Sequence, residues 1–269
     1  MKFNHKKYSF VFDSDEYRTP DSKFKKSFLP ASLKFYSKFA FIVSYCNLKT
    51  KLKIYDRYNW AASSIHILRS LESVGVKLHI TGLNNLRKCE EPVIFVANHM
   101  STLETVILPA IIQPLMRVCF VMKKELTTYP LFGPVSKARH PIIVGRSNPR
   151  DDLRIVLEEG ARRLESGISI IIFPQRTRSN SIDFKKFNTL GVKLAQKNKV
   201  KVIPIAILSD AWSNGKLIKE FGPIDTNKEV RFSFGEPIAT DTSSSEAQSK
   251  TIEFIKNSFI SWDKQSYIM

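Results

Sequence analysis

The chain has 269 residues, of which 43% are hydrophobic, so it can bury the core of one large domain, with or without a small appendage. Its formal net charge of +17 implies an anionic partner: nucleic acid, an anionic lipid surface or a phosphorylated small molecule. Three scattered cysteines lack the spacing of a disulfide framework or a metal site, which indicates a reducing compartment: Cys46, Cys89 and Cys119.

The beginning of the sequence predicts neither a signal peptide nor a membrane-spanning helix. Residues 1–21 are polar and charged where a signal peptide needs an apolar stretch. Nowhere do about 18 apolar residues follow one another, as a spanning helix requires. We expect residues 1–29 to form a poorly ordered or loosely docked arm, and association with a membrane surface stays open.

Residues 30–46 predict an amphipathic helix. Apolar side chains recur there at spacings of three and four residues, at Leu33, Tyr36, Ala40 and Val43. The mixture of aromatic and basic side chains in and before this stretch is typical of a helix that lies in a lipid interface. The same pattern also suits a helix docked on the protein's own core, so both interpretations remain open.

The rest of the sequence alternates helices with apolar strands, which is typical of an α/β domain. We predict strands over residues 76–80, 93–97, 117–122, 141–144, 168–173, 200–208, 216–221 and 229–234. We predict helices over residues 55–74, 102–112, 135–138, 151–166, 190–198 and 243–262, and a turn over residues 82–85. Pro204 interrupts one predicted strand, which argues for a sheet edge or a bulge there.

These elements predict an α/β fold with a mixed, largely parallel sheet covered by helices, preceded by an amphipathic helical segment that associates with a membrane. Residues 1–75 would form the N-terminal arm and the amphipathic helices, and residues 76–269 the α/β domain. No internal repeat is evident, and no linker is long enough to split the core.

A histidine and a carboxylate follow the predicted strand over residues 93–97. His99 comes directly after it, and Glu104 follows after four intervening residues. Imidazole can act as a base near physiological pH, and a carboxylate on its other nitrogen would fix the tautomer. Ser101 and Glu104 also match a capping box, in which the glutamate reaches back to the serine amide. The pattern therefore predicts a general base with its orienting acid, a helix cap, or both.

Basic residues stand at the exits of three other predicted strands: Lys123, Lys124, Arg146, Arg176 and Arg178. The planar fork of arginine matches the oxygens of a phosphate. Single arginines of this kind are usually solvated surface charges, but several strand exits carry them here. A base beside an anion clamp suggests activation of a hydroxyl on a phosphorylated substrate.

On these residues the chain resembles the glycerolipid acyltransferase family, which includes the 1-acylglycerol-3-phosphate O-acyltransferases. Residues 98–104 look like the family's first block, a histidine and an acid separated by four residues. Residues 124–146 look like the second block, which ends in a substrate-binding arginine. Residues 173–179 resemble the third, usually Phe-Pro-Glu-Gly-Thr-Arg-Ser, and residues 202–206 the fourth, an apolar strand with a proline.

The resemblance implies that His99 is the general base and that Glu104 orients it. It implies substrate-binding roles for six residues: Lys124, Arg146, Gln175, Arg176, Thr177 and Arg178. It implies no metal or redox cofactor, because the acyl donor is a thioester of coenzyme A or of acyl carrier protein. We expect a lysophospholipid acceptor, most simply 1-acylglycerol-3-phosphate, an anionic membrane surface as a partner, and no nucleic acid. The protein would be membrane-associated, peripheral or monotopic, on the cytoplasmic face.

Three positions depart from the family pattern. Glu104 stands where aspartate is more usual, which keeps the charge. Gln175 replaces glutamate and Arg176 replaces glycine, which removes an anion and adds a cation beside the expected phosphate. Two alternatives therefore stay open: an acyltransferase for another lysolipid, such as a lyso-aminolipid or a lipid A precursor, and a non-catalytic basic membrane-surface protein.

Overall fold

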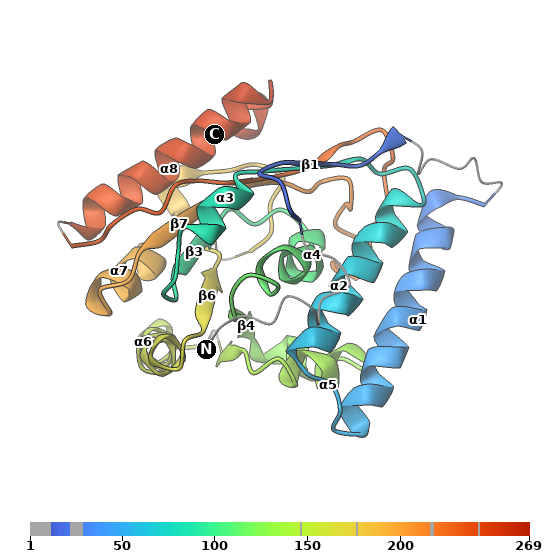
Figure 1. Ribbon diagram of the computed structural model, residues 1–269, viewed down its shortest axis with the longest axis horizontal. Coiled ribbons are helices and arrows are strands. Elements are labelled where there is room, and N and C mark those ends of the chain that lie inside the picture. Colours follow the sequence, from blue (N-terminus) through green and yellow to red (C-terminus); the bar gives the residue numbers. More distant parts are fainter. Residues whose placement is uncertain (1–11, 22–28, 146, 176, 216–217, 242) are drawn as a thin grey trace.

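A computed structural model describes residues 12–21, 29–145, 147–175, 177–215, 218–241 and 243–269 (Figure 1). Two of the expected substrate-binding residues, Arg146 and Arg176, lie outside the described residues, as does most of the N-terminal arm. The part of the arm that is described joins the sheet: β1 (Tyr17–Arg18) pairs with β2 (Leu78–Thr81).

Within the described residues, eight strands form one sheet in the order β1-β2-β8-β7-β3-β6-β4-β5. The other strands are β3 (Ile94–Ala97), β4 (Val118–Lys123), β5 (Ile142–Val144), β6 (Ser169–Ile172), β7 (Val202–Leu208) and β8 (Val230–Phe234). Strands β7, β3, β6, β4 and β5 are parallel neighbours, and β2 is parallel to β8. Antiparallel pairs join β1 to β2 and β7 to β8. The prediction of a mixed, largely parallel sheet is confirmed.

Helices cover both faces of this sheet (Figure 1). On one face lie α4 (Leu103–Ile112), α2 (Arg57–Glu72) and, outside them, α1 (Ala31–Lys51). The opposite face carries α6 (Pro149–Glu165), α7 (Leu190–Lys197) and α8 (Ser244–Ser261). Two short helices complete the set, α3 (Leu83–Arg87) and α5 (Phe132–Lys137). The predicted turn over residues 82–85 is thus mostly the start of α3.

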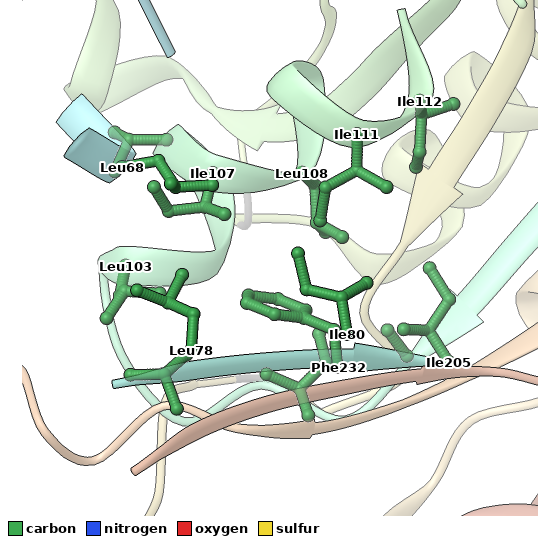
Figure 2. Packing of buried hydrophobic residues seen from close by; sticks show 14 of the residues in the cluster. Leu68, Leu78, Ile80, Leu103, Ile107, Leu108, Ile111, Ile112, Ile205 and Phe232 are labelled. Carbon is green, nitrogen blue, oxygen red and sulfur yellow. The ribbon is translucent and has the colours of Figure 1, made fainter. Parts of the chain in front are cut away.

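Successive side chains of each strand point to opposite faces of the sheet, which explains why helices cover both faces. In β3, Phe95 belongs to the cluster under α2 and α4, whereas Ile94 and Val96 belong to the cluster under α6 and α7. Because both faces of each central strand are covered, the strands read as continuous apolar runs. Helix α4 fills the space between the sheet and α2, and Figure 2 shows its leucines and isoleucines between Leu68 of α2 and the sheet residues Ile80 and Phe232.

Two expectations about the later strands need correction. Residues 218–221 form a turn closed by the Phe221 amide on the Ile218 carbonyl, not part of a strand. Pro204 lies in β7, which is interior, so the sheet edge is the wrong alternative for this proline. The bulge is the one that fits, since residues 235–237 lie opposite residues 203–204 between the pairs Ile205–Phe234 and Val202–Ile238. The sheet tolerates this proline because the β7–β8 ladder ends nearby: Gly235 donates to the Pro204 carbonyl, and pairing resumes only at Ile238.

Helix α1 docks with a face that overlaps the predicted stripe only in part: Tyr36 and Val43 pack against the core, but Phe35 and Phe39 are its buried centre. Phe35 and Phe39 are buried against the ring of Trp212, with centroids 5.0 and 5.4 Å away. Each buried aromatic of this size stabilises the fold by about 1.5–3 kcal/mol. Leu33, from the predicted stripe, is 58% exposed. The helix therefore docks on the core and also presents apolar side chains outward.

We predict that Gly82→Ala destabilises the chain far more than Gly167→Ala. Both glycines have left-handed backbone, with φ of 77° and 71°. A Cβ at Gly82 would lie 2.1 Å from the carbonyl oxygen of Phe234, whereas one at Gly167 meets nothing within 4 Å. The Gly167 variant should lose about 1 kcal/mol of unfolding free energy and the Gly82 variant at least about 2 kcal/mol more, measured by urea unfolding. Equal losses would contradict this packing.

Candidate active site

The carboxyl ends of the five parallel strands meet at one edge of the sheet, where ligands bind in open α/β sheets. His99 follows β3, Arg178 follows β6 and Ser209 follows β7. Because β3 lies between β6 and β7, the loops that carry these three residues are neighbours. The sheet order alone brings together segments that are far apart in the sequence.

The side chain of Asn98 fixes the path of the chain after β3. Its Nδ2 donates to the carbonyl of Ile207 at 2.8 Å, and its Oδ1 accepts from the Ile207 amide at 2.8 Å. One buried side chain thus replaces the strand pairing that ends at Ala97. The position of the next residue, His99, follows from this anchor.

The imidazole of His99 contacts the carboxylate of Glu104. The distance from Nδ1 to Oε1 is 2.8 Å. Because an ionised carboxylate only accepts hydrogen bonds, Nδ1 is the donor, and Nε2 of the neutral ring carries no proton. The ring also stacks on Phe173, with centroids 4.1 Å apart and an angle of 14° between the planes. Its tautomer and its plane are both fixed, as a general base requires.

The carboxylate of Glu104 is fully buried and accepts further hydrogen bonds. Oε1 accepts hydrogen bonds from the backbone amides of Met100 at 2.6 Å and Ser101 at 2.9 Å. Oε2 accepts hydrogen bonds from the hydroxyls of Ser101 at 3.0 Å and Ser209 at 2.6 Å. Burial alone would raise the pKa of Glu104, but the hydrogen bond and charge of His99, with Ser209 and the Ser101 amide, hold that pKa below its usual value. Glu104 is therefore ionised beside the imidazole.

Of the capping box predicted from the sequence, the half in which Glu104 accepts from the Ser101 amide is present, but α4 has Thr102 as its N-cap, with no side-chain cap hydrogen bond. The Ser101 hydroxyl accepts from the amide of Leu103 at 3.1 Å, where α4 begins, and Glu104 takes the Ser101 amide in return. The positive end of the α4 dipole favours the negative charge at this place. The backbone amides of Met100 and Ser101 are thus the local reason why the carboxylate points back toward His99.

The segment that follows β6 holds the His99 backbone on both sides. Gln175 Oε1 accepts from the His99 amide at 2.5 Å, and the Ser179 amide donates to the His99 carbonyl at 3.0 Å. Arg178 donates from Nη1 to the hydroxyl of Thr102. The first and third sequence blocks are therefore in direct contact, and Arg178, on the loop after β6, bonds to the loop that carries His99.

The other expected binding residues lie at different distances from this contact. Gln175 is buried, with its oxygen on the His99 backbone, and Thr177 is exposed. Lys124 is exposed and begins the short helix Lys124–Thr127 at the exit of β4. Arg146 and Arg176 lie outside the described residues. The catalytic and substrate-binding roles of all these residues stay predictions.

Three residues near Arg178 and Glu104 were not anticipated from the sequence. Ser209 completes the Glu104 network from the end of β7. Glu220 Oε1 lies 2.5 Å from Nη2 of Arg178, and Lys219 Nζ lies 2.7 Å from the hydroxyl of Thr177. None belongs to a motif, and only the position of Ser209 just after an apolar strand was a signal. In the described ranges, no cluster of three or more His, Cys, Asp or Glu side chains could hold a metal ion.

The chain is similar to known acyltransferases. Residues 77–208 match the family model described as Acyltransferase. A 1-acyl-sn-glycerol-3-phosphate acyltransferase from Pseudomonas aeruginosa is 32% identical over 148 residues, which are 55% of this chain and 55% of that protein. The Haemophilus influenzae protein of the same name is 31% identical over 143 residues, 50% of this chain and 58% of its own length. The chain thus spans little more than half the length of these relatives.

A solved structure shares the fold. The crystal structure of the 1-acyl-sn-glycerophosphate (LPA) acyltransferase PlsC from Thermotoga maritima superposes with a TM-score of 0.64 and 20% sequence identity. The match covers 87% of this chain and 95% of that one, so it includes helices outside the segment of the family model. The resemblance to glycerolipid acyltransferases seen in the four sequence blocks is confirmed by the family match and the relatives, and the solved structure shares the α/β fold.

We predict that Glu104→Gln lowers the free energy of unfolding by about 2–4 kcal/mol at pH 7, because an amide cannot satisfy the donors that now surround a buried carboxylate. The folded-state pKa of Glu104 is depressed, so its contribution is present above the unfolded value of about 4.3 and is lost as the pH falls through the folded-state pKa. The difference in free energy of unfolding between the wild type and the variant should therefore decrease as the pH falls, measured by urea unfolding from pH 7 to pH 3.

The control for this prediction is Glu236→Gln, an exposed carboxylate paired with Lys88. It should change the free energy of unfolding by less than about 0.5 kcal/mol at either pH. A gap between the wild type and the Glu104 variant that does not depend on pH would show that the charge of Glu104 is not what stabilises the loop.

Proposed function

We propose that this chain, which carries an acyltransferase-family domain at residues 77–208, moves a fatty acyl group from an acyl thioester to the free hydroxyl of a lysophospholipid. The observation that carries the proposal is the His99–Glu104 contact, with Arg178 bonded to Thr102 on the same loop. A proton acceptor and an anion-binding group in one small site are what this reaction needs.

In the proposed reaction, Nε2 of His99 takes the proton of the acceptor hydroxyl while that oxygen attacks the thioester carbonyl. The tetrahedral intermediate then expels the thiolate, so that a C–O bond forms and a C–S bond breaks. The proton passes from His99 to the leaving sulfur. Glu104 stabilises the imidazolium that exists between the two proton transfers. The thioester of coenzyme A or acyl carrier protein supplies the activation, so no metal or redox cofactor is required.

The proposed acceptor is 1-acylglycerol-3-phosphate. Arg178 is the residue best suited to its phosphate, because a guanidinium can bind two phosphate oxygens at once. The names of the Pseudomonas aeruginosa and Haemophilus influenzae relatives support this choice. The product would then be phosphatidic acid. Lys124, Arg146 and Arg176 are further candidate cations for the phosphate of the acceptor.

A second acceptor class is favoured by one observation. The carboxylate of Glu220 already pairs with Arg178, and Gln175 uses its oxygen on the His99 backbone. An acceptor without a phosphomonoester, such as a lyso-aminolipid or a lipid A precursor, would leave the Glu220–Arg178 pair intact. The two classes differ in the head group only and share the chemistry at His99.

We further propose that the outward face of α1 rests in an anionic membrane surface, on the cytoplasmic side. The exposed apolar residues of this face are Leu33, Phe41, Tyr45, Leu48 and Leu52. Contiguous exposed apolar side chains mark interaction surfaces, and basic neighbours add about 1 kcal/mol each near anionic lipid. Lys38 and Lys49 line the 840 Å³ groove between α1 and α2. Among the described residues, no helix combines the length and apolarity that crossing a bilayer requires.

We predict that His99→Ala reduces acyl transfer at least about 10²–10⁴-fold, because the general base is lost, while the fold persists. Transfer is measured by mass spectrometry with defined acyl thioesters and a panel of lysolipids, which also ranks the two acceptor classes. His79→Gln is the control, since His79 lies in β2 and pairs with Glu16. Turnover at the wild-type rate in the His99 variant would refute the proposed role.

We predict that the double substitution Phe41→Ser and Leu48→Ser weakens vesicle binding at least about tenfold, because the outward face of α1 loses its largest apolar side chains. Flotation with anionic and with neutral vesicles measures the effect. Ile260→Ser is the matched control, since Ile260 is 46% exposed on α8. Equal binding by the α1 variant and the control would contradict this orientation.

A further inference from the structure

Residues 218–225, named here the Glu220 segment, connect α1 to the candidate active site. On one side, the ring of Phe221 lies against Tyr36 and Phe39, with centroids 5.8 and 6.4 Å away. The hydroxyl of Tyr36 donates to the carbonyl of Gly222. On the other side, the segment presents Glu220 to Arg178. It lies outside residues 77–208, and none of the four sequence blocks includes it.

The carboxylate of Glu220 is held on Arg178 by several contacts. The side chains of Arg178 and Glu220 are only 13% and 16% exposed, so water and salt screen the pair weakly. The indole of Trp212 donates to the Glu220 carbonyl at 3.1 Å, which fixes the backbone. The hydroxyl of Tyr129 lies 3.4 Å from the second carboxylate oxygen. Glu220 therefore occupies the arginine edge that an anionic ligand would use.

The neighbouring residue brings a positive charge to the same place. Lys219 Nζ donates to the Thr177 hydroxyl at 2.7 Å. Burial first, and then the charges of Arg178 and Lys123, lower the pKa of Lys219, while Glu220 opposes that shift. Lys219, Arg178 and Lys123 thus gather positive charge around one position, and Glu220 neutralises part of it.

We propose that Lys219 and Glu220 belong to the acceptor site and set its selectivity: Lys219 is a second cation for the phosphate of the head group, and Glu220 is a carboxylate that the phosphate must displace from Arg178. The inference rests on the proposed function, because it assumes that Arg178 faces the acceptor. It assigns the selectivity to a segment that the sequence blocks do not contain.

The physical basis is competition between two anions for one guanidinium. A phosphomonoester carries about −1.5 to −2 charges at pH 7 and offers three strong acceptor oxygens, against one charge on a carboxylate. The phosphate therefore wins when it is present, but its affinity is reduced by what it costs to release Glu220. A lysolipid without a phosphomonoester does not compete for Arg178 and is unaffected.

The test measures binding without turnover. Isothermal titration of the full chain with glycerol 3-phosphate, inorganic phosphate and coenzyme A compares the wild type with Glu220→Gln. The variant should bind glycerol 3-phosphate about fivefold more tightly, since one competing charge is gone. Lys219→Gln should bind it about fivefold more weakly. Glu236→Gln makes the same charge change at a distant exposed site and should leave binding as in the wild type.

Kinetics supply the second measurement. In Glu220→Gln, the KM for 1-acylglycerol-3-phosphate should fall about fivefold, while kcat and the KM for a monoacylglycerol stay unchanged. The fivefold decrease in KM should disappear when Glu220→Gln is combined with Arg178→Met, because Glu220 acts through Arg178. Thermal unfolding of each variant checks that the fold is intact, and Lys219→Gln remains decisive if Glu220→Gln does not fold.

The outcomes separate this inference from the proposed function. Unchanged or weaker glycerol 3-phosphate binding in a folded Glu220 variant overturns the inference, since it makes Glu220 a support for Arg178 and not a competitor. A gain in binding of coenzyme A but not of glycerol 3-phosphate overturns the assignment to the acceptor. If the wild type transfers no acyl group to any lysolipid but Glu220→Gln still binds glycerol 3-phosphate more tightly, the proposed function fails and the anion site stands.

Discussion

The buried carboxylate of Glu104 is the constraint on which the candidate site depends. It joins the start of α4, the loop after β3 and the end of β7 through hydrogen bonds from His99, Ser101 and Ser209. A buried charge is tolerated only when its partners satisfy it, and here each oxygen has at least two. The imidazole is consequently oriented by the same contacts that fix the fold around it.

Much of the fold and the centre of the site could be predicted from the sequence, because both depend on local patterns. The apolar runs that become β3 and β6 are recognisable since both faces of these strands are buried. The contact between His99 and Glu104 spans only five positions, and the Ser101 amide, the one half of the predicted capping box that forms, turns the carboxylate back along the chain. Sequence spacing was therefore sufficient to pair them.

The parts that could not be predicted depend on contacts between distant segments. Glu220 and Arg178 form an ion pair although they are 42 positions apart in the sequence, and no motif near either residue predicts the contact. The buried face of α1 was predicted only in part, with Tyr36 and Val43 but without Phe35 and Phe39, because the helix is apolar on both sides and Trp212 decides which side packs. Pro204 was expected at an edge or a bulge since proline breaks ladders, and only the pairing with β8 excludes the edge.

The aromatic contact of Phe221 with Tyr36 and Phe39 has an evolutionary consequence. Both partners lie outside residues 77–208, so under the selectivity proposed for the Glu220 segment two homologues with the same four sequence blocks would prefer different head groups. Mutational drift in the first helix would be compensated in the segment after β7, and the two stretches should covary across orthologues. Subfamilies would then be better distinguished by the first helix and the Glu220 segment together than by the four sequence blocks.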